Sequence, residues 1–343
     1  MPNETYILED YIEFLNPQLL SMLLRDNTTS NESIQHNIYW ATNDYESMGE
    51  GFRFHDEILP QNITGEHGIV IQPRVKKVKE RQTKRVKKMA EVFTPAWVCN
   101  CMENVLDEEW FGRKDVFNTV WNDEKEWKAT EEKIWFPEGK TWQEYVCNTV
   151  LEITCGEAPF LASRYDAVTG IAIPVKERIG ILDRKLRIVG ENVDDEAAWI
   201  KAAKVAMMSS YGYEWQGDSL LLARENMLWT IMDYYQEKFG KQMPAELLPD
   251  FAYIISWNLW QMDGLKSVLP DSCKNGVEED VVIGADSLFP ETVRKTVYCE
   301  SCKKGRFTKH NGIRCLITDW VRDFDNPRKG GTELFEDSYK GDN

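Results

Sequence analysis

Short apolar runs alternate with longer amphipathic segments through the middle of the chain. The run 150–161 (VLEITCGEAPFL) predicts a short strand, a glycine turn and then a helix. A helix is predicted over 196–209, and a long amphipathic helix follows it, with apolar residues at helical spacing from Leu220 to Tyr235. The segment 251–264 predicts a strand ending in an acidic residue. Strands that alternate with helices are typical of a mostly parallel α/β sheet, which is the fold class we predict.

The residues around this central region differ in pattern. Thr94 and Pro95 predict a helix start, with a capping hydroxyl followed by proline at the first helical position, and Val98, Met102 and Val105 continue one face of that helix. Trp, Thr, Lys and Glu between 110 and 146 predict a hairpin insertion. Three regions are therefore expected: an N-terminal region with a basic helix over 1–89, a ligand-binding domain over 90–270, and a C-terminal knuckle and tail over 271–343.

Composition narrows the class of protein. The 343 residues are 42% hydrophobic and include thirteen tryptophans, which excludes a disordered chain. The first residues lack the layout of a signal peptide, and no apolar run reaches the ~18 residues of a membrane span. We therefore expect a cytoplasmic protein that makes no membrane contact, with its eight cysteines reduced or bound to metal.

Charge is unevenly spread along the chain. The net charge of −16 excludes a protein that binds nucleic acid over its whole surface. The stretch Arg74 to Lys88, however, holds nine basic residues and one acid. It predicts either phosphate contacts with double-stranded DNA or a solvated helix face. An acidic chain with one basic stretch also suits a subunit whose partner supplies most of the DNA contact.

Three strand ends carry the candidate chemistry. Ligands bind at the carboxyl ends of parallel strands. Gly156 forms a tight turn whose main-chain N–H groups can hold a carboxylate. Glu214 can accept both hydroxyls of a ribose, and Asp263 can accept from the amine of an adenine, with Trp215 and Phe160 along the faces of the base. Together these groups predict a site for a nucleoside with an amino-acid tail.

Four segments, in order, resemble adenine-N6 DNA methyltransferases of restriction–modification systems. Phe93-Thr94-Pro95 resembles the family's FxTP motif, and 152–161 resembles its DPACGSGAFL motif. Residues 211–214 (YGYE) resemble its ribose-binding YGxD/E, and 258–263 (NLWQMD) its NIxxxD. The resemblance implies a Rossmann-like S-adenosylmethionine-dependent methyltransferase sheet and the methylation subunit of a restriction enzyme. The cofactor-binding residues that it implies are Phe93, Thr94, Pro95, Glu152, Thr154, Cys155, Gly156, Glu157, Phe160, Glu214, Trp215 and Asp263.

The chain departs from the family's pattern at three points. The family's CGSG is Cys155-Gly-Glu-Ala158, so its second glycine is replaced, and Glu152 stands where aspartate is the rule. About 58 residues separate Gly156 from Glu214, against the ~20–30 of one βαβ step, which predicts an insertion. Asp183 is for this reason an alternative ribose acid.

The tetrapeptide that positions the target amine, D/N-P-P-Y/F, is missing. The nearest candidate is 280–289 (DVVIGADSLF), where Asp286 and Phe289 would be the catalytic residues without the two prolines. Only 80 residues follow Asp263, fewer than the well over ~100 that the remaining strands and helices need. We expect a sheet that is incomplete or completed by another chain.

The C-terminal cysteines predict a metal knuckle. Cys299-x-x-Cys302 is followed by a glycine turn, and a tetrahedral zinc would take both of these thiolates. Its other two ligands would come from Cys273, His310 and Cys315; free thiols in a small domain are the alternative.

Three functions remain open. The chain is a cofactor-binding methyltransferase subunit whose catalytic motif comes from a partner chain, or a divergent enzyme using Asp286 and Phe289. The third alternative is a non-catalytic, methyltransferase-like binding or decoy module.

Overall fold

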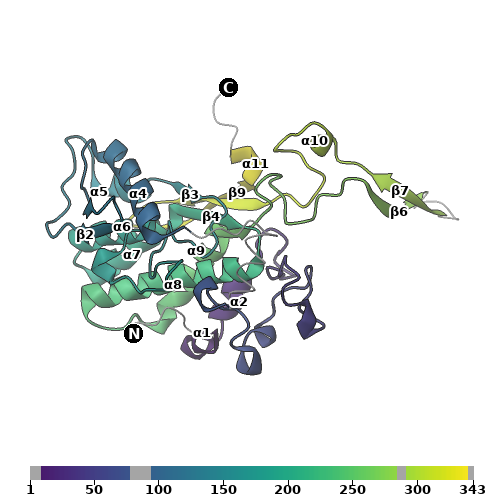
Figure 1. Ribbon diagram of the computed structural model, residues 1–343, viewed down its shortest axis with the longest axis horizontal. Coiled ribbons are helices and arrows are strands. Elements are labelled where there is room, and N and C mark those ends of the chain that lie inside the picture. The colour runs from purple at the N-terminus through teal and green to yellow at the C-terminus, as the bar shows by residue number, and fades with distance from the viewer. Residues whose placement is uncertain (1–8, 78–93, 284–290, 339–343) are drawn as a thin grey trace.

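A three-stranded parallel sheet lies at the centre of the computed structural model, which describes residues 9–77, 94–283 and 291–338 (Figure 1). Its order is β3 (Val150–Glu152), β4 (Ser210–Glu214) and β5 (Leu259–Gln261), with Leu151 opposite Tyr211 and Glu214 opposite Gln261. The predicted α/β class with a parallel sheet is confirmed at this level.

Helices connect the strands and cover them. Two helices, α6 and α7, lie between β3 and β4, so the predicted insertion is present, and α8 and α9 lie between β4 and β5. The α-helices are α1 (Glu9–Leu15), α2 (Leu19–Leu24), α4 (Ala96–Phe111), α5 (Trp142–Cys147), α6 (Ile181–Asn192), α7 (Glu196–Met208), α8 (Gly217–Phe239), α9 (Leu248–Asn258), α10 (Glu300–Lys303) and α11 (Phe335–Ser338). The 3₁₀ turns are η1 (Glu46–Met48), η2 (Pro60–Asn62), η3 (Gly65–His67), η4 (Arg74–Lys76), η5 (Val175–Glu177) and η6 (Ala245–Leu247).

Three antiparallel hairpins complete the described structure. They are β1 (Asn118–Trp121) with β2 (Glu126–Ala129), β6 (Val277–Ile283) with β7 (Glu291–Val297), and β8 (Leu316–Val321) with β9 (Arg328–Leu334). The first confirms the hairpin predicted within 110–146. The second projects from the body as an arm (Figure 1).

The core is centred on α8, which is buried along most of its length, as its predicted apolar spacing requires. Arg224 of this helix is fully buried and donates hydrogen bonds to the Leu259 carbonyl (2.9 Å) and the Arg25 carbonyl (3.0 Å). Burial lowers its pKa to about 10. One guanidinium thus joins the N-terminal region to β5, which places α2 beside the sheet.

The prediction of a strand over 251–264 is wrong for most of its length. Residues 251–258 belong to α9, and only 259–261 form a strand. Because α9 is apolar on nearly all sides, its periodicity does not distinguish a buried helix from a buried strand. Asn258 ends the helix, and its Nδ2 donates to the carbonyls of Met207 (2.8 Å) and Ser210 (3.0 Å).

The helix predicted directly after Gly156 is also wrong. Residues 153–161 form turns, and the next helix, α6, begins only at Ile181. The first N–H groups of α6 nevertheless donate to the carbonyls of Phe160 (2.8 Å) and Leu161 (2.9 Å). The helix therefore resumes in space where the turn stops, after an excursion over 163–180. The cap of α4 differs too: Pro95 is the N-cap residue, and Asp166 rather than Thr94 accepts the Ala96 N–H (2.7 Å).

The face of α4 that was expected to enter the core lies outside it. Met102 and Val105 are 54% and 64% exposed, and the buried face carries Glu103 and Asp107 instead. Asp107 pairs with the buried Arg184 of α6. A buried arginine needs such acceptors, so polar pairing rather than apolar periodicity sets the rotation of α4.

No helix in the described ranges is long and apolar enough to cross a membrane.

The turn from β4 into α8 depends on a glycine, which gives a testable prediction. A Cβ on Gly217 would lie 2.2 Å from the Tyr39 carbonyl oxygen, whereas a Cβ on Gly190 in α6 would meet nothing within 4 Å. We expect Gly217→Ala to lower the free energy of unfolding by about 2–3 kcal/mol because the backbone must move. The control Gly190→Ala should raise it by about 0.5–1 kcal/mol. Urea denaturation of both variants measures this, and equal stabilities would contradict the packing of this turn.

Candidate functional site

The ends of β3 and β4 meet at one carboxylate. Glu214, at the end of β4, is buried, and its Oε2 accepts the Gly156 N–H (2.9 Å) while its Oε1 accepts the Gln216 N–H (3.0 Å). Burial raises the pKa of Glu214, and these main-chain hydrogen bonds oppose the rise. The parallel register places the glycine turn and this acid at the same edge of the sheet.

Asp263 lies at the same edge, after β5. The Met262 N–H donates to the Glu214 carbonyl (2.9 Å), which continues the ladder to the residue before Asp263. Asp263 Oδ1 accepts the Leu265 N–H (2.9 Å), and its Oδ2 lies 3.2 Å from Lys266 Nζ. Each carboxylate oxygen can accept a second hydrogen bond, so both acids keep capacity for a ligand.

The turn after β3 is held by Glu152. Its carboxylate is buried and accepts the N–H groups of Phe160 (3.4 Å) and Leu161 (3.1 Å). Burial raises the pKa of Glu152 to about 8, and those two hydrogen bonds act against the rise. Gly156 has φ +55°, and Ala158, where the family motif has its second glycine, has φ +60°. The alanine thus adopts a backbone conformation that favours glycine.

Other predicted ligand residues have partners within the protein. Glu157 accepts the Arg74 N–H (2.7 Å) and the Tyr165 hydroxyl (2.6 Å), so it braces the turn. The Trp215 indole donates to the Ala41 carbonyl (3.1 Å). Thr154 is exposed, its hydroxyl donating to the neighbouring Ile153 carbonyl (2.7 Å).

The remaining cofactor candidates lie around the same turn or outside the description. Cys155 is buried, which raises its pKa, and Phe160 is half-buried. Thr94 and Pro95 precede α4, while Phe93 lies outside the described residues.

Asp183, the alternative ribose acid, is not at a strand end. It lies in α6, fully buried, and accepts from the N–H (2.8 Å) and hydroxyl (3.0 Å) of Ser163. A separate hollow of about 680 Å³ between β2, α6 and α8 is partly lined by Asp183, Arg187 and Lys238. The structure brings Glu214, not Asp183, to Gly156.

The two catalytic candidates, Asp286 and Phe289, lie outside the described residues. The strand that leads toward them was expected to be a fourth strand of the parallel sheet. Instead β6 pairs antiparallel with β7 in the arm. This part of the expected arrangement is therefore wrong.

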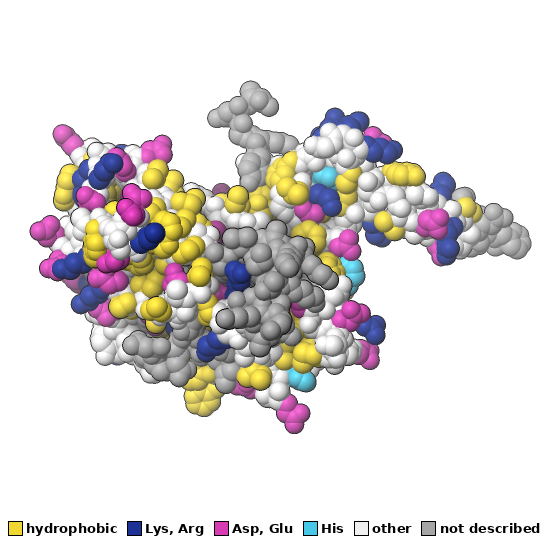
Figure 2. Space-filling model, in the orientation of Figure 1, with side chains coloured by type: hydrophobic (Ala, Val, Ile, Leu, Met, Phe, Trp, Pro, Cys, Tyr) yellow, Lys and Arg dark blue, Asp and Glu magenta, His cyan; other side chains and the backbone are white. Residues whose placement is uncertain are grey.

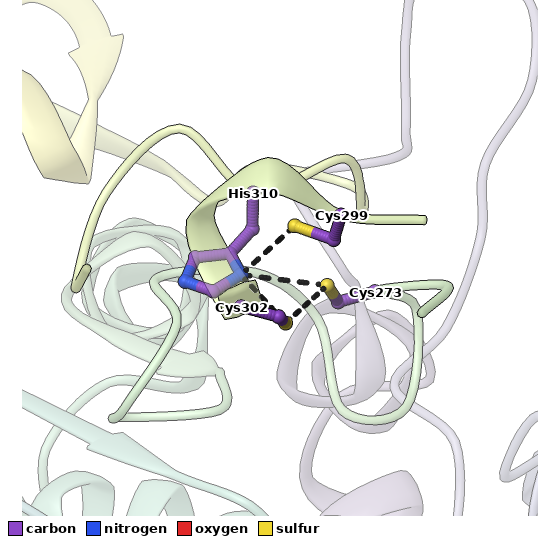
Figure 3. A group of neighbouring side chains, drawn as sticks. All are labelled: Cys273, Cys299, Cys302 and His310. Atoms are coloured by element: carbon purple, nitrogen blue, oxygen red, sulfur yellow. Dashed lines mark hydrogen bonds between the residues drawn. The ribbon is translucent and has the colours of Figure 1, made fainter. Parts of the chain in front are cut away.

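Four side chains at the base of the arm form a cluster that could hold a metal ion (Figure 3). His310 Nδ1 lies 3.4 Å from the Sγ atoms of Cys273, Cys299 and Cys302, and the Sγ atoms of Cys273 and Cys302 are 3.6 Å apart. A tetrahedral site with Zn–S of about 2.3 Å and Zn–N of about 2.0 Å separates its ligand atoms by about 3.5–3.8 Å. The cluster therefore has the donor set and the spacing of a structural zinc site.

Surrounding groups orient these ligands. His310 Nε2 donates to the Arg306 carbonyl (2.8 Å), which leaves Nδ1 for a metal. The pKa of Cys299 is lowered to about 6: burial opposes the thiolate, but the main-chain groups of Cys302 and Asn311 favour it. Cys315 does not join the cluster, because its thiol donates to the Gln261 carbonyl (3.4 Å).

Sequence reasoning missed Lys266, which links the two sites. Its ammonium pairs with Asp263, and burial of part of the side chain opposes a pKa that Asp263, Cys273 and Cys302 together raise. The only available signal was a lysine three residues after the acid, a spacing too common to be informative.

No family model, no curated protein and no solved structure matches this chain. Its function must therefore be argued from its own residues and their geometry.

The metal cluster gives the first prediction from this site. We expect the purified protein to hold about one zinc ion per chain and Cys299→Ser and Cys302→Ser to lose it, because each removes one thiolate of four. Elemental analysis by plasma mass spectrometry measures the content. Cys315→Ser is the matched control and should keep the metal; loss in the control alone would contradict the ligand assignment.

Glu152 gives a prediction on pH. Its pKa is 4.5 ordinarily and about 8 in the fold, so between these values the native state holds a proton that the unfolded chain has lost. The free energy of unfolding should then fall as pH rises through this window, by at most about 1.4 kcal/mol per pH unit from this group. Glu152→Gln should flatten the decline, measured by urea denaturation from about pH 5 to 9. Glu109→Gln, at an exposed position of α4, is the control. A decline of the same steepness in Glu152→Gln would exclude this carboxyl as its source.

Proposed function

We propose that the chain is the S-adenosylmethionine-binding subunit of a DNA adenine-N6 methyltransferase of a restriction–modification system, built on a Rossmann-like sheet. The observation that carries the proposal is the hydrogen bond from the Gly156 N–H to Glu214. It joins the glycine turn after one parallel strand to the acid that ends the next, as a nucleoside site at the carboxyl edge requires. The four motifs, in order, support the same assignment.

Each group at this edge has a role in the proposed site. The turn at Gly156, with Thr94 and Pro95, would bind the methionine end of the cofactor. Glu214 would accept the ribose hydroxyls and Asp263 the adenine amine, with Trp215 and Phe160 along the base. The bound cofactor supplies an electrophilic methyl group. The chain's own residues bind and orient it, so their contribution is proximity rather than acid–base chemistry.

We assign the missing tetrapeptide to a second protein chain. In doubly wound sheets the fourth strand lies beside the first, and β3, the first strand here, pairs with β4 and with no other described strand. Near this edge α4 exposes Met102, Val105 and Leu106. A strand from the partner, followed by D/N-P-P-Y/F, would extend the sheet at β3 and cover this apolar face.

The basic stretch is proposed as a DNA contact with one member removed. Lys77 is buried and lies 3.1 Å from Asp218 of α8, so its charge is neutralised inside the protein. Residues 78–88 lie outside the described part of the chain. For the cysteine–histidine cluster we propose a structural zinc, since all four ligands come from the protein and leave no open position.

A non-catalytic binding or decoy module is the second candidate. One observation favours it: both oxygens of Glu214 already accept main-chain N–H groups, and Asp263 already pairs with Lys266. A site closed in this way could serve as a scaffold. A divergent enzyme using Asp286 and Phe289 is less favoured, because β6 lies outside the parallel sheet.

Calorimetric titration with S-adenosylmethionine tests the proposal. We expect one-to-one binding by the wild type, and a loss of at least about tenfold in affinity for Asp263→Ala and Glu214→Ala, since each removes a charged acceptor worth about 1.5–3 kcal/mol. Asp319→Ala, an exposed acid on β8, is the control. Absence of binding by the wild type would move the weight to the decoy, and unchanged affinity in both variants would refute the site assignment.

A further inference from the structure

The metal knuckle carries a concentrated positive charge on an acidic protein. Between Tyr298 and His310 the chain has four basic residues and one acid, Glu300, although the whole chain has a net charge of −16. All four basic side chains belong to exposed residues: Lys303, Lys304, Arg306 and Lys309. Figure 2 shows dark-blue side chains gathered over α10, at the upper right of the molecule.

The fold of the knuckle presents these charges outward. Cys302 and His310 hold the two ends of the loop at the cluster, and Lys309 lies in the left-handed region with φ +61°. The Lys309 N–H donates to Glu336 (2.6 Å), and its carbonyl accepts the Ser301 hydroxyl (2.8 Å). The loop is therefore fixed by its main chain, which leaves the side chains for solvent or a ligand.

Neutralisation within the protein is partial. Glu300 lies 3.2 Å from Lys303 and 3.5 Å from Lys304, so one acid serves two lysines. Among the described residues, no ion pair engages the side chains of Arg306 or Lys309. Exposed ion pairs of this kind are also weak, so a polyanion can displace them.

Aromatic surface lies next to the charges. Tyr298 is 58% exposed, with the Lys303 ammonium 4.8 Å from its ring centre, and Phe307 is 37% exposed. Cations beside exposed rings suit nucleic acid, because the cations neutralise phosphates and the rings contact sugars or bases.

The knuckle stands on the carboxyl edge of the sheet. Val268 bridges both Asp263 and Arg314, and the Cys315 N–H donates to the Ser267 carbonyl (3.2 Å). These contacts join the loop after β5 to the segment that follows His310. The basic face is thus attached to the loop that carries the proposed adenine acid.

We propose that the outer face of the knuckle, formed by Lys303, Lys304, Arg306 and Lys309, binds the phosphate backbone of duplex DNA beside the proposed methyl-donor site. The choice of duplex DNA rests on the proposed function; the anionic character of the ligand rests on the charges alone. The metal would then act on DNA binding indirectly, by holding the loop that displays the cations.

A charge-removal variant tests this surface. The variant replaces all four basic residues by alanine and keeps every metal ligand. Binding of a fluorescently labelled duplex of about three helical turns is measured by anisotropy over a series of salt concentrations. Each lost phosphate contact should reduce the slope of log K against log salt by about 0.9, so we expect a reduction of about 2–4 and an affinity at least about tenfold lower.

The control removes four exposed lysines from another part of the surface and changes the net charge equally: Lys114→Ala, Lys125→Ala, Lys128→Ala and Lys133→Ala. Equal slopes in the two variants would overturn the proposal, as would tighter binding of a single strand of the same length. Metal content and S-adenosylmethionine binding are measured on the knuckle variant, and both should equal the wild type. If the wild type binds no S-adenosylmethionine while the knuckle variant alone loses the salt slope, the proposed function fails and the nucleic-acid surface stands.

Discussion

The buried carboxylate of Glu214 is the constraint on which the carboxyl edge of the sheet depends. A buried charge that lacks hydrogen bonds costs several kcal/mol, so its two main-chain donors must stay in place. They come from separate segments, the turn after β3 and the start of α8. Gly217 then allows α8 to approach the Tyr39 carbonyl closely, and its N–H donates to Trp40. The same few residues therefore shape the glycine turn, start the central helix and dock the N-terminal region.

The metal cluster plays the corresponding part for the C-terminal segment. Between 272 and 310 the buried residues that the structure describes are few, namely Cys299, Ser301 and His310. A segment with so little apolar core needs cross-links, and four protein ligands on one ion supply them. Because Lys266 pairs with Asp263 close to the cluster thiols, the electrostatics of the metal site and of the sheet edge are connected.

The sequence predicts those features that depend on local pattern. The long helix α8 and the β1–β2 hairpin follow from periodicity and turn residues, and the Cys299–Cys302 pair follows from ligand spacing. The errors arise where distant contacts decide. α9 is apolar all round, so only its packing makes it a helix rather than a strand; α4 turns its acids inward because Arg184 requires them. No local pattern indicates that Asp183 is occupied by Ser163, or that Cys315 faces Gln261 instead of the metal.

The distribution of charge and apolar surface bears on how such a chain could approach DNA. With a net charge of −16, most of its surface repels a polyanion, and attraction is confined to the knuckle and the stretch from Arg74 to Lys88. The features left open are of another kind: the edge of β3 offers main-chain hydrogen bonds, and α4 offers an apolar stripe. A strand from a second protein satisfies both at once, whereas DNA satisfies neither, since it supplies no strand and little apolar area. Division of labour follows from this chemistry: the apolar edge suits a protein partner, the basic faces suit phosphates, and the partner must bring the rest of the positive charge.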